Sequence, residues 1–135
     1  MGHDRTTRWK QRFANFEKAF LFFERATQQD EYNPIEVGGL VQAFECAFEL
    51  GWKTVKDYLE AQGVETNYPR EVIQEAYRSR LIEDGHTWIH MLEKRNELSH
   101  TYNEGVARMA VLTIKERYTP ALAQVYHLLK SKNYE

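Results

Sequence analysis

Five polar side chains that suit the handling of a phosphate ester stand together in the stretch RNELSHTY, residues 95–102. Arg95 keeps its positive charge and needs an anion or a fork of acceptors nearby. His100 titrates near neutrality, so it can take up and release a proton. Asn96, Ser99 and Tyr102 add hydrogen-bonding groups beside them. A cation next to a titratable imidazole is typical of phosphate chemistry.

These residues end a predicted helix, and a helical wheel places them on its inner side. At about 100° per residue, with Arg95 at zero, Trp88 falls near 20° and Leu92 near 60°. The polar residues of the cluster continue this arc, at angles from about 340° to about 140°. Groups on an inward arc lose water and must find partners.

A structural role for the same residues stays open. Arg95 is also able to pair with Glu or Asp of another helix and lock the end of a bundle. Asn96 and His100 lie one turn apart and are able to hydrogen-bond each other.

Other chemical sites are weaker. His86 and His90 have the i, i+4 spacing of metal ligands, but the wheel puts both on the solvated face, and HTWIH lacks the Glu of a zinc-protease helix. Cys46 has no flanking charge that would make it a thiolate, so we expect a small buried hydrophobe. We therefore expect no metal and no cofactor.

The rest of the chain reads as helices with short loops. Apolar residues step by 4, 3, 4 and 3 in the first segment: Trp9, Phe13, Phe16, Phe20 and Phe23. Asn33 and Pro34 suit the start of a second long helix, which Gly63 ends. Gly38 and Gly39, early in it, either permit a close helix crossing or weaken its first turn.

The second half of the chain continues the pattern. Pro69 opens a third helix, and Asp84 caps a fourth that runs to about Tyr102, with Asn103 and Gly105 as its stop. A last segment spans about residues 106–129, and Pro120 either kinks it or divides it. The pattern predicts an all-α, antiparallel bundle of four or five helices in one domain, residues 1–135.

Composition narrows the function classes. A net charge of −2 over 135 residues argues against a large nucleic-acid footprint but leaves room for a small basic site. The single cysteine excludes an intramolecular disulfide, and apolar runs fall far short of the ~20 residues that span a bilayer. We expect a cytoplasmic protein with no membrane contact.

The spacing of Arg95, His100 and Tyr102 resembles the Arg-x4-His-x-Tyr motif of HEPN-domain proteins of the HepT type, with four residues in the first gap and one in the second. The chain is most similar to the nucleotidyltransferase substrate-binding proteins. The likeness includes the aromatic first helix, the long Phe- and Trp-bearing second helix, the run from Trp88 to Glu104 and the long last helix.

The resemblance implies a homodimer whose motif residues face each other across a shared cleft, and a minimal nucleotidyltransferase as partner. In the toxin–antitoxin branch the HEPN subunit is a metal-independent ribonuclease, which the partner silences by transferring AMP to the motif tyrosine. Carried over, Arg95 would hold the scissile phosphate and His100 would be the general acid–base. Asn96 and Ser99 would orient them, and Tyr102 would be modified.

Three readings compete at this point. The first is an endoribonuclease toxin, which the intact motif favours. The second is a non-catalytic subunit that binds a nucleotide or substrate for the transferase, which the net charge of −2 favours slightly. The third is a dimeric scaffold in which Arg95 and His100 are structural.

Overall fold

The computed structural model describes residues 2–100 and 102–134, and most of these are helical. The elements, in chain order, are α1 (Gly2–Ala26), α2 (Pro34–Ala61), α3 (Pro69–Arg78), α4 (Gly85–His100), α5 (Glu104–Thr113), the π-helical segment η1 (Ile114–Tyr118) and α6 (Thr119–Asn133). No strand occurs in the described part of the chain. The predicted all-α helical bundle is confirmed.

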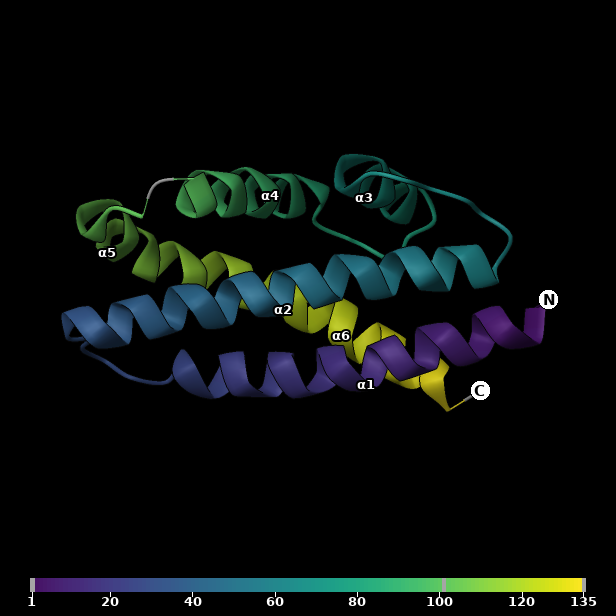
Figure 1. The fold of residues 1–135 in the computed structure, drawn as a ribbon, viewed down its shortest axis with the longest axis horizontal. Helices are drawn as coiled ribbons and strands as arrows, with labels where there is room; N and C mark the ends of the chain where they lie inside the picture. Colours follow the sequence, from purple (N-terminus) through teal and green to yellow (C-terminus); the bar gives the residue numbers. More distant parts are fainter. Residues whose placement is uncertain (1, 101, 135) are drawn as a thin grey trace.

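Helix α2 is the central element of the bundle (Figure 1). Helix α1 lies along it in the opposite direction, and the run α5–η1–α6 crosses behind it. Helices α3 and α4 follow each other along another side of α2, and α4 also packs on η1. Helix α4, whose end carries the polar cluster, is therefore placed by contacts with α2 and η1.

Local capping sets the ends of α2 as predicted. The Asn33 side chain accepts the N–H of Glu36, and the Glu36 carboxylate accepts the N–H of Asn33, which is a complete capping box. At the other end Gly63 has a φ of +89°, and Val64 donates to the carbonyl of Leu59. The left-handed φ is one that glycine adopts without strain, so the helix ends there.

The aromatic stripe of α1 forms the centre of the core, and all five of its predicted members are buried. Phe13 and Phe20 stack on Tyr126 of α6, with ring centroids 5.8 and 4.7 Å apart. Phe44 of α2 stacks on Tyr118 of η1 at 5.0 Å. The prediction for Cys46 was wrong: it is exposed, because it lies on the side of α2 that these rings do not cover.

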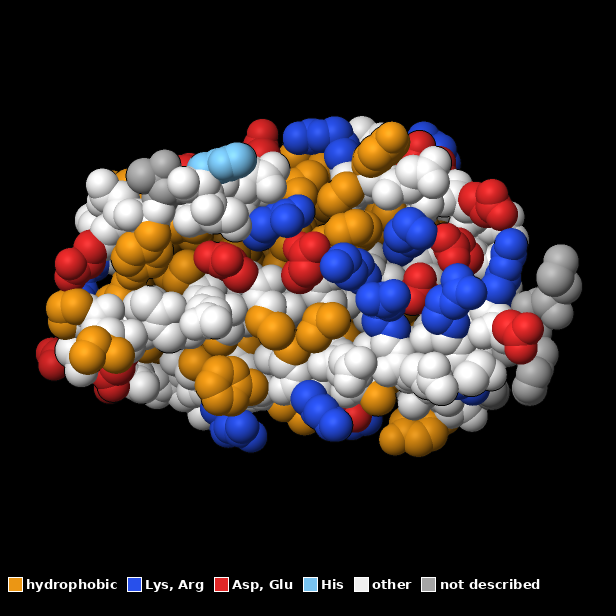
Figure 2. Space-filling view, viewed as in Figure 1, with side chains coloured by type: hydrophobic (Ala, Val, Ile, Leu, Met, Phe, Trp, Pro, Cys, Tyr) orange, Lys and Arg blue, Asp and Glu red, His pale blue; other side chains and the backbone are white. Residues whose placement is uncertain are grey.

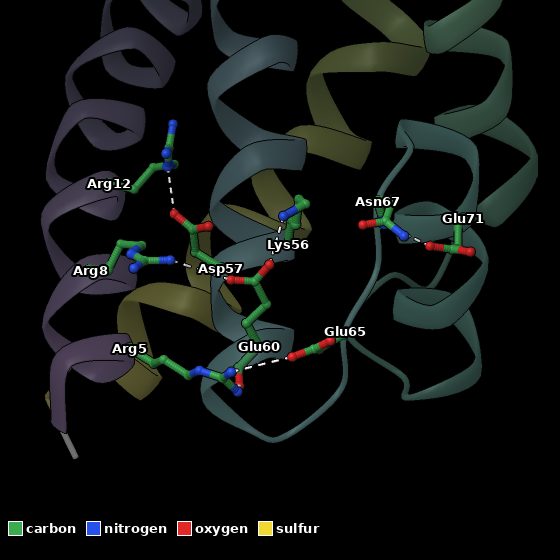
Figure 3. A network of polar contacts seen from close by, with 9 residues as sticks. All are labelled: Arg5, Arg8, Arg12, Lys56, Asp57, Glu60, Glu65, Asn67 and Glu71. Carbon is green, nitrogen blue, oxygen red and sulfur yellow. Dashed lines mark hydrogen bonds and ion pairs between the residues drawn. The ribbon is translucent and has the colours of Figure 1, made fainter. Parts of the chain in front are cut away.

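A ladder of ion pairs joins α1 to α2 and to the loop after it, and Figure 3 shows it from close by. Its nitrogen–oxygen distances are 3.3, 3.6 and 2.6 Å for the pairs Arg5–Glu65, Arg8–Glu60 and Arg12–Asp57. Asp57 is almost fully buried, and the Nε of Arg12 donates to it. We call these three pairs the α1–α2 ladder.

The last predicted segment departs from its expected boundaries. Asn103 accepts the N–H of Val106 and so begins α5, whereas we had expected it to end the preceding helix. Pro120 neither breaks the helix nor ends it, because the π-helical turn η1 directly before it accommodates the proline. The Thr119 N–H reaches back to the carbonyl of Ile114, the Thr119 hydroxyl donates to the same oxygen, and α6 starts with Pro120 in its first turn.

Candidate functional site

Helix α4 carries the polar cluster, and its start is fixed by Asp84 as predicted. One carboxylate oxygen of Asp84 accepts the N–H of Thr87 at 3.0 Å, and the other accepts the Thr87 hydroxyl at 2.6 Å. These hydrogen bonds hold the pKa of Asp84 below its ordinary value. The apolar side of α4 is buried from Trp88 to Leu98, so the helix has one fixed rotation in the bundle.

Arg95 turns towards α2, as the wheel predicted. Its Nη1 lies 3.2 Å from a carboxylate oxygen of Glu49, and its guanidinium carbon lies 5.9 Å from the centre of the Phe48 ring. The side chain is 23% exposed. Its Nε is buried and has no hydrogen-bond partner within the described residues. Arg95 is therefore held as a cation, with one buried donor still open to an acceptor.

Two carboxylates of α2 lie beneath this arginine, and the sequence analysis missed both. Glu49 pairs with Arg95 and with Lys53, whose Nζ is 3.4 Å away. Glu45 is one turn earlier; burial raises its pKa, and the charge of Arg95 opposes that rise. The signal was present, since two acids at i, i+4 spacing interrupt the apolar face of a long helix.

Asn96, Ser99 and His100 are exposed, so the predicted inward direction is wrong for these three residues. The reason lies in Leu98, which is buried and falls near 300° on the wheel. It draws the buried arc of the last turns away from Ser99 and His100. The suggested contact between Asn96 and His100 does not form: both side chains face solvent.

Tyr102 lies beside α2 near Gly38 and is 51% exposed. A side-chain carbon added at Gly38 would lie 3.5 Å from its hydroxyl, whereas one added at Gly39 would meet nothing within 4 Å. Both positions leave room for a side chain, so no close helix crossing is seen at either glycine in the described part of the chain. Tyr102 thus lies next to α2 with about half of its surface open to solvent.

Within one chain the two central residues of the cluster point in different directions. Arg95 packs on α2, while His100 lies about 140° further round α4 and faces solvent. No hydrogen bond or ion pair joins them among the described residues. The arrangement places a guanidinium that pairs with α2 and an exposed imidazole on one helix end without bringing them together.

The two remaining histidines of α4 have different surroundings. His86 is exposed, as predicted. His90 is half-buried, which corrects its placement on the solvated face: its Nδ1 lies 2.5 Å from the hydroxyl of the fully buried Tyr118. Burial lowers the pKa of His90 and raises the pKa of Tyr118 to about 12. No group of three or more His, Cys, Asp or Glu side chains in residues 2–100 and 102–134 is arranged to hold a metal ion.

The molecule is thus an all-α bundle whose fourth helix carries Arg95 and His100 near its end, with Tyr102 just beyond it. A model of the family described as nucleotidyltransferase substrate binding protein like matches residues 11–131. The chain therefore belongs to the nucleotidyltransferase substrate-binding protein family. The resemblance seen in the sequence is confirmed.

Two individual relatives support this assignment. The chain is 35% identical over 80 residues to a Haemophilus influenzae protein named probable ribonuclease HepT. That match covers 56% of this chain and 54% of the relative, so it spans about half the length of each. A crystal structure of a protein from Thermus thermophilus has the same fold, with a TM-score of 0.77 and 31% identity; the match covers 84% of this chain and 98% of that one.

None of the described helices is both long and apolar enough to cross a membrane.

Proposed function

We propose that this chain is the HEPN toxin-type subunit of a two-component system with a minimal nucleotidyltransferase, and that it cleaves RNA without a metal ion. The observation that carries the proposal is the state of Arg95, a fixed cation with an unfilled buried donor, on the same helix end as an exposed imidazole. The ribonuclease name of the Haemophilus influenzae relative agrees with it. Residues 1–135 would form one HEPN-like domain acting in the cytoplasm.

The reaction uses a nucleophile that RNA itself supplies. The ribose 2′-oxygen attacks the phosphorus, the bond from phosphorus to the 5′-oxygen breaks, and a 2′,3′-cyclic phosphate results. His100 takes the proton from the 2′-hydroxyl and returns it to the leaving 5′-oxygen. Arg95 binds the phosphate and stabilises the charge that develops in the transition state. Asn96 and Ser99, both exposed beside them, would orient Arg95 and His100.

A homodimer is part of this proposal. Because Arg95 and His100 of one chain diverge, one copy alone does not present both groups to a single phosphate. A two-fold axis near the end of α4 would set the arginine of one copy opposite the histidine of the other, since a symmetric interface pairs each patch with itself.

Tyr102 is the proposed site of silencing. Its oxygen would attack the α-phosphorus of ATP in the partner transferase, and pyrophosphate would leave with the broken bond. The half-exposed Tyr102 side chain is open to such a reaction. The added AMP brings bulk and negative charge close to Arg95 and so opposes RNA binding.

A second candidate function is a non-catalytic subunit that binds a nucleotide or substrate for the transferase. The pairing of Arg95 with Glu49 favours it, because this carboxylate already neutralises part of the charge that RNA would need. The family description names substrate binding as well.

Two measurements separate the candidates. Co-expression with a nucleotidyltransferase encoded beside this chain, followed by intact mass, should show added AMP that maps to Tyr102 and is absent from Tyr102→Phe. The unmodified chain should then cleave single-stranded RNA in the presence of a chelator, and His100→Ala should not. A stable complex with no added mass and no cleavage would support the substrate-binding subunit instead.

A further inference from the structure

A hollow of the described structure lies between α3 and α4, away from Arg95. Its volume is about 920 Å³, and η1 contributes to its wall. We call it the α3–α4 groove and define it by six of its lining residues: Tyr77, His86, Ile89, His90, Glu93 and Arg117. An aromatic ring, an isoleucine and three basic side chains thus share one surface with a single acid.

Tyr77 gives the groove a stacking surface. Its neighbours Ile73 and Ala76 on α3 are buried, but its own side chain is 58% exposed. One part of the ring lies against the start of α4: a side-chain carbon added at Gly85 would be only 3.0 Å from it. The ring is therefore supported from one side and open on the other. An immobilised, half-open aromatic ring is the platform on which nucleic-acid bases stack.

Arg117 gives the groove a positioned cation. Its Nε donates to the Thr87 hydroxyl at 3.0 Å, and Thr87 is itself held by Asp84. Its two terminal nitrogens have no hydrogen-bond or ion-pair partner within the described residues. The π-helical turn that carries Arg117 is a local irregularity of the kind found at functional sites. A guanidinium fixed through one nitrogen, with the other two open, suits a phosphate.

His90 supplies a neutral donor. Its Nδ1 and the Tyr118 hydroxyl share a hydrogen bond at 2.5 Å. In the tautomer in which the hydroxyl donates to Nδ1, the imidazole carries its own proton on Nε2, as a donor for a base edge or a ribose hydroxyl. Glu93, the one acid of the set, lies 4.0 Å from Arg70 of α3, which offsets its charge.

The groove and His100 lie on the same side of α4. On the wheel His100 falls at about 140°, between Ile89 at about 120° and Glu93 at about 160°. The distance along the helix axis from His90 to His100 is about 15 Å. A strand that leaves the proposed cleavage site along this side of α4 reaches the groove within a few nucleotides.

We propose that the α3–α4 groove is a binding subsite for the single-stranded RNA that flanks the scissile phosphate, with a base on Tyr77 and a phosphate on Arg117. This inference rests on the proposed function and names how its substrate is held. The groove contributes affinity and length dependence, and it takes no part in the bond-breaking step.

The first test is substrate length. Wild type and Tyr77→Ala are compared on a dinucleotide, which contains only the scissile phosphate, and on a single strand of about 12 nucleotides. Tyr77→Ala should raise the KM for the long RNA about tenfold and leave kcat, and the rate on the dinucleotide, unchanged. Tyr68→Ala is the matched control, because Tyr68 is exposed at the start of the same helix, makes no capping bond and does not line the groove.

The second test is salt dependence in a His100→Ala background, where RNA binds without being cut. Arg117→Gln should lower the slope of log affinity against log salt by about 0.7 for single strands. Melting temperatures of all variants show whether the bundle is intact.

The outcomes are distinct. If wild type cleaves both RNAs and Tyr77→Ala has the same KM values as wild type, the subsite is overturned and the proposed function stands. Length-dependent binding without cleavage would support the subsite and count against catalysis. Loss of the dimer or of the transferase complex in Tyr77→Ala, with RNA affinity unchanged, would assign the groove to a protein partner and overturn the proposal.

Discussion

Two arginines, Arg12 of the α1–α2 ladder and Arg95 of α4, pair with carboxylates of the same central helix, yet their surroundings differ. Asp57, the partner of Arg12, is 7% exposed and 2.6 Å away. Glu49, the partner of Arg95, is 33% exposed, 3.2 Å away, and shared with Lys53. The Nε of Arg12 donates to its acid, whereas the Nε of Arg95 is buried and open.

The difference teaches how to read such pairs. In the ladder the donors and acceptors are matched within the chain, so the arrangement stabilises the helix pair. At Arg95 the match is incomplete, and an unfilled buried donor is destabilising unless a ligand completes it. The same residue types thus serve packing in one region and leave a donor open to an acceptor in the other.

The two regions also differ on the surface. Figure 2 shows Lys, Arg, Asp and Glu side chains gathered over the half of this face where α1 begins, with hydrophobic side chains more frequent towards the end where α5 lies. Among the exposed large apolar side chains are Tyr102, Met109 and Leu112. An apolar surface beside the polar cluster is consistent with the proposed contact between two copies.

The largest expected effect in this comparison is that of Arg95→Ala. Removing a positioned cation from the transition state should lower kcat for RNA cleavage by about 10² to 10³-fold. The melting temperature should stay close to that of wild type, because the remaining Glu49 is still paired with Lys53. Cleavage assays and thermal unfolding on the same samples check this. Loss of the folded state with the activity would make Arg95 structural, like Arg12.

Asp57→Asn is the reciprocal change in the ladder. It removes the buried charge that Arg12 faces, so the free energy of unfolding should fall by about 2 kcal/mol, a value between those of exposed and buried pairs. Cleavage of RNA by the folded fraction should not change. Urea unfolding and a cleavage assay below the transition measure both. A marked drop in kcat with unchanged stability would erase the distinction between the two regions.

Much of the fold was predictable because its signals are local. The stripe from Trp9 to Phe23 and the cap at Asn33 act within a few residues of themselves, and they specify α1 and the start of α2 without knowledge of their neighbours. Asn103 was misjudged because a capping residue can end one helix or begin the next, and only the following N–H groups decide.

The site was predictable in its residues more than in its geometry. The motif identified Arg95, His100 and Tyr102, but Glu45 and Glu49 are far from them in sequence, so only tertiary packing shows that they lie beneath the arginine. His90 was misplaced for the same reason. A helical wheel describes one helix alone, and Tyr118, which contacts His90, lies on a separate π-helical turn. Asn96, Ser99 and His100 were turned inward by a wheel that left out Leu98.

Glu49→Gln tests the role of the Arg95 pair with a smaller expected effect. It keeps the size of the side chain and one acceptor but removes the charge that orients Arg95. We expect kcat to fall about tenfold with little change in KM, because Arg95 stays present but is less well placed. Glu49→Asp should recover part of the loss. Steady-state kinetics check this, and a rise in RNA affinity with unchanged kcat would show instead that Glu49 only competes with the phosphate.

The smallest expected effect concerns the pH dependence of the stability that Asp84 gives to α4, the helix that carries the site. Hydrogen bonds from Thr87 hold the pKa of Asp84 below its ordinary value of 3.8, so the folded state favours the charged carboxylate. The resulting stability is present above pH 3.8 and is lost as the pH falls through the lower folded value. Asn caps helices nearly as well as Asp. At neutral pH the free energy of unfolding of Asp84→Asn should therefore lie within about 1 kcal/mol of the wild-type value. The difference in free energy of unfolding between the two proteins should narrow as the pH drops below 3.8.

The free energy of unfolding of wild type and Asp84→Asn, measured from neutral to acid pH, tests this pH dependence. The other carboxylates titrate in both proteins and cancel in the difference. A gap that stays constant across this range would mean that the cap acts through its hydrogen bonds alone.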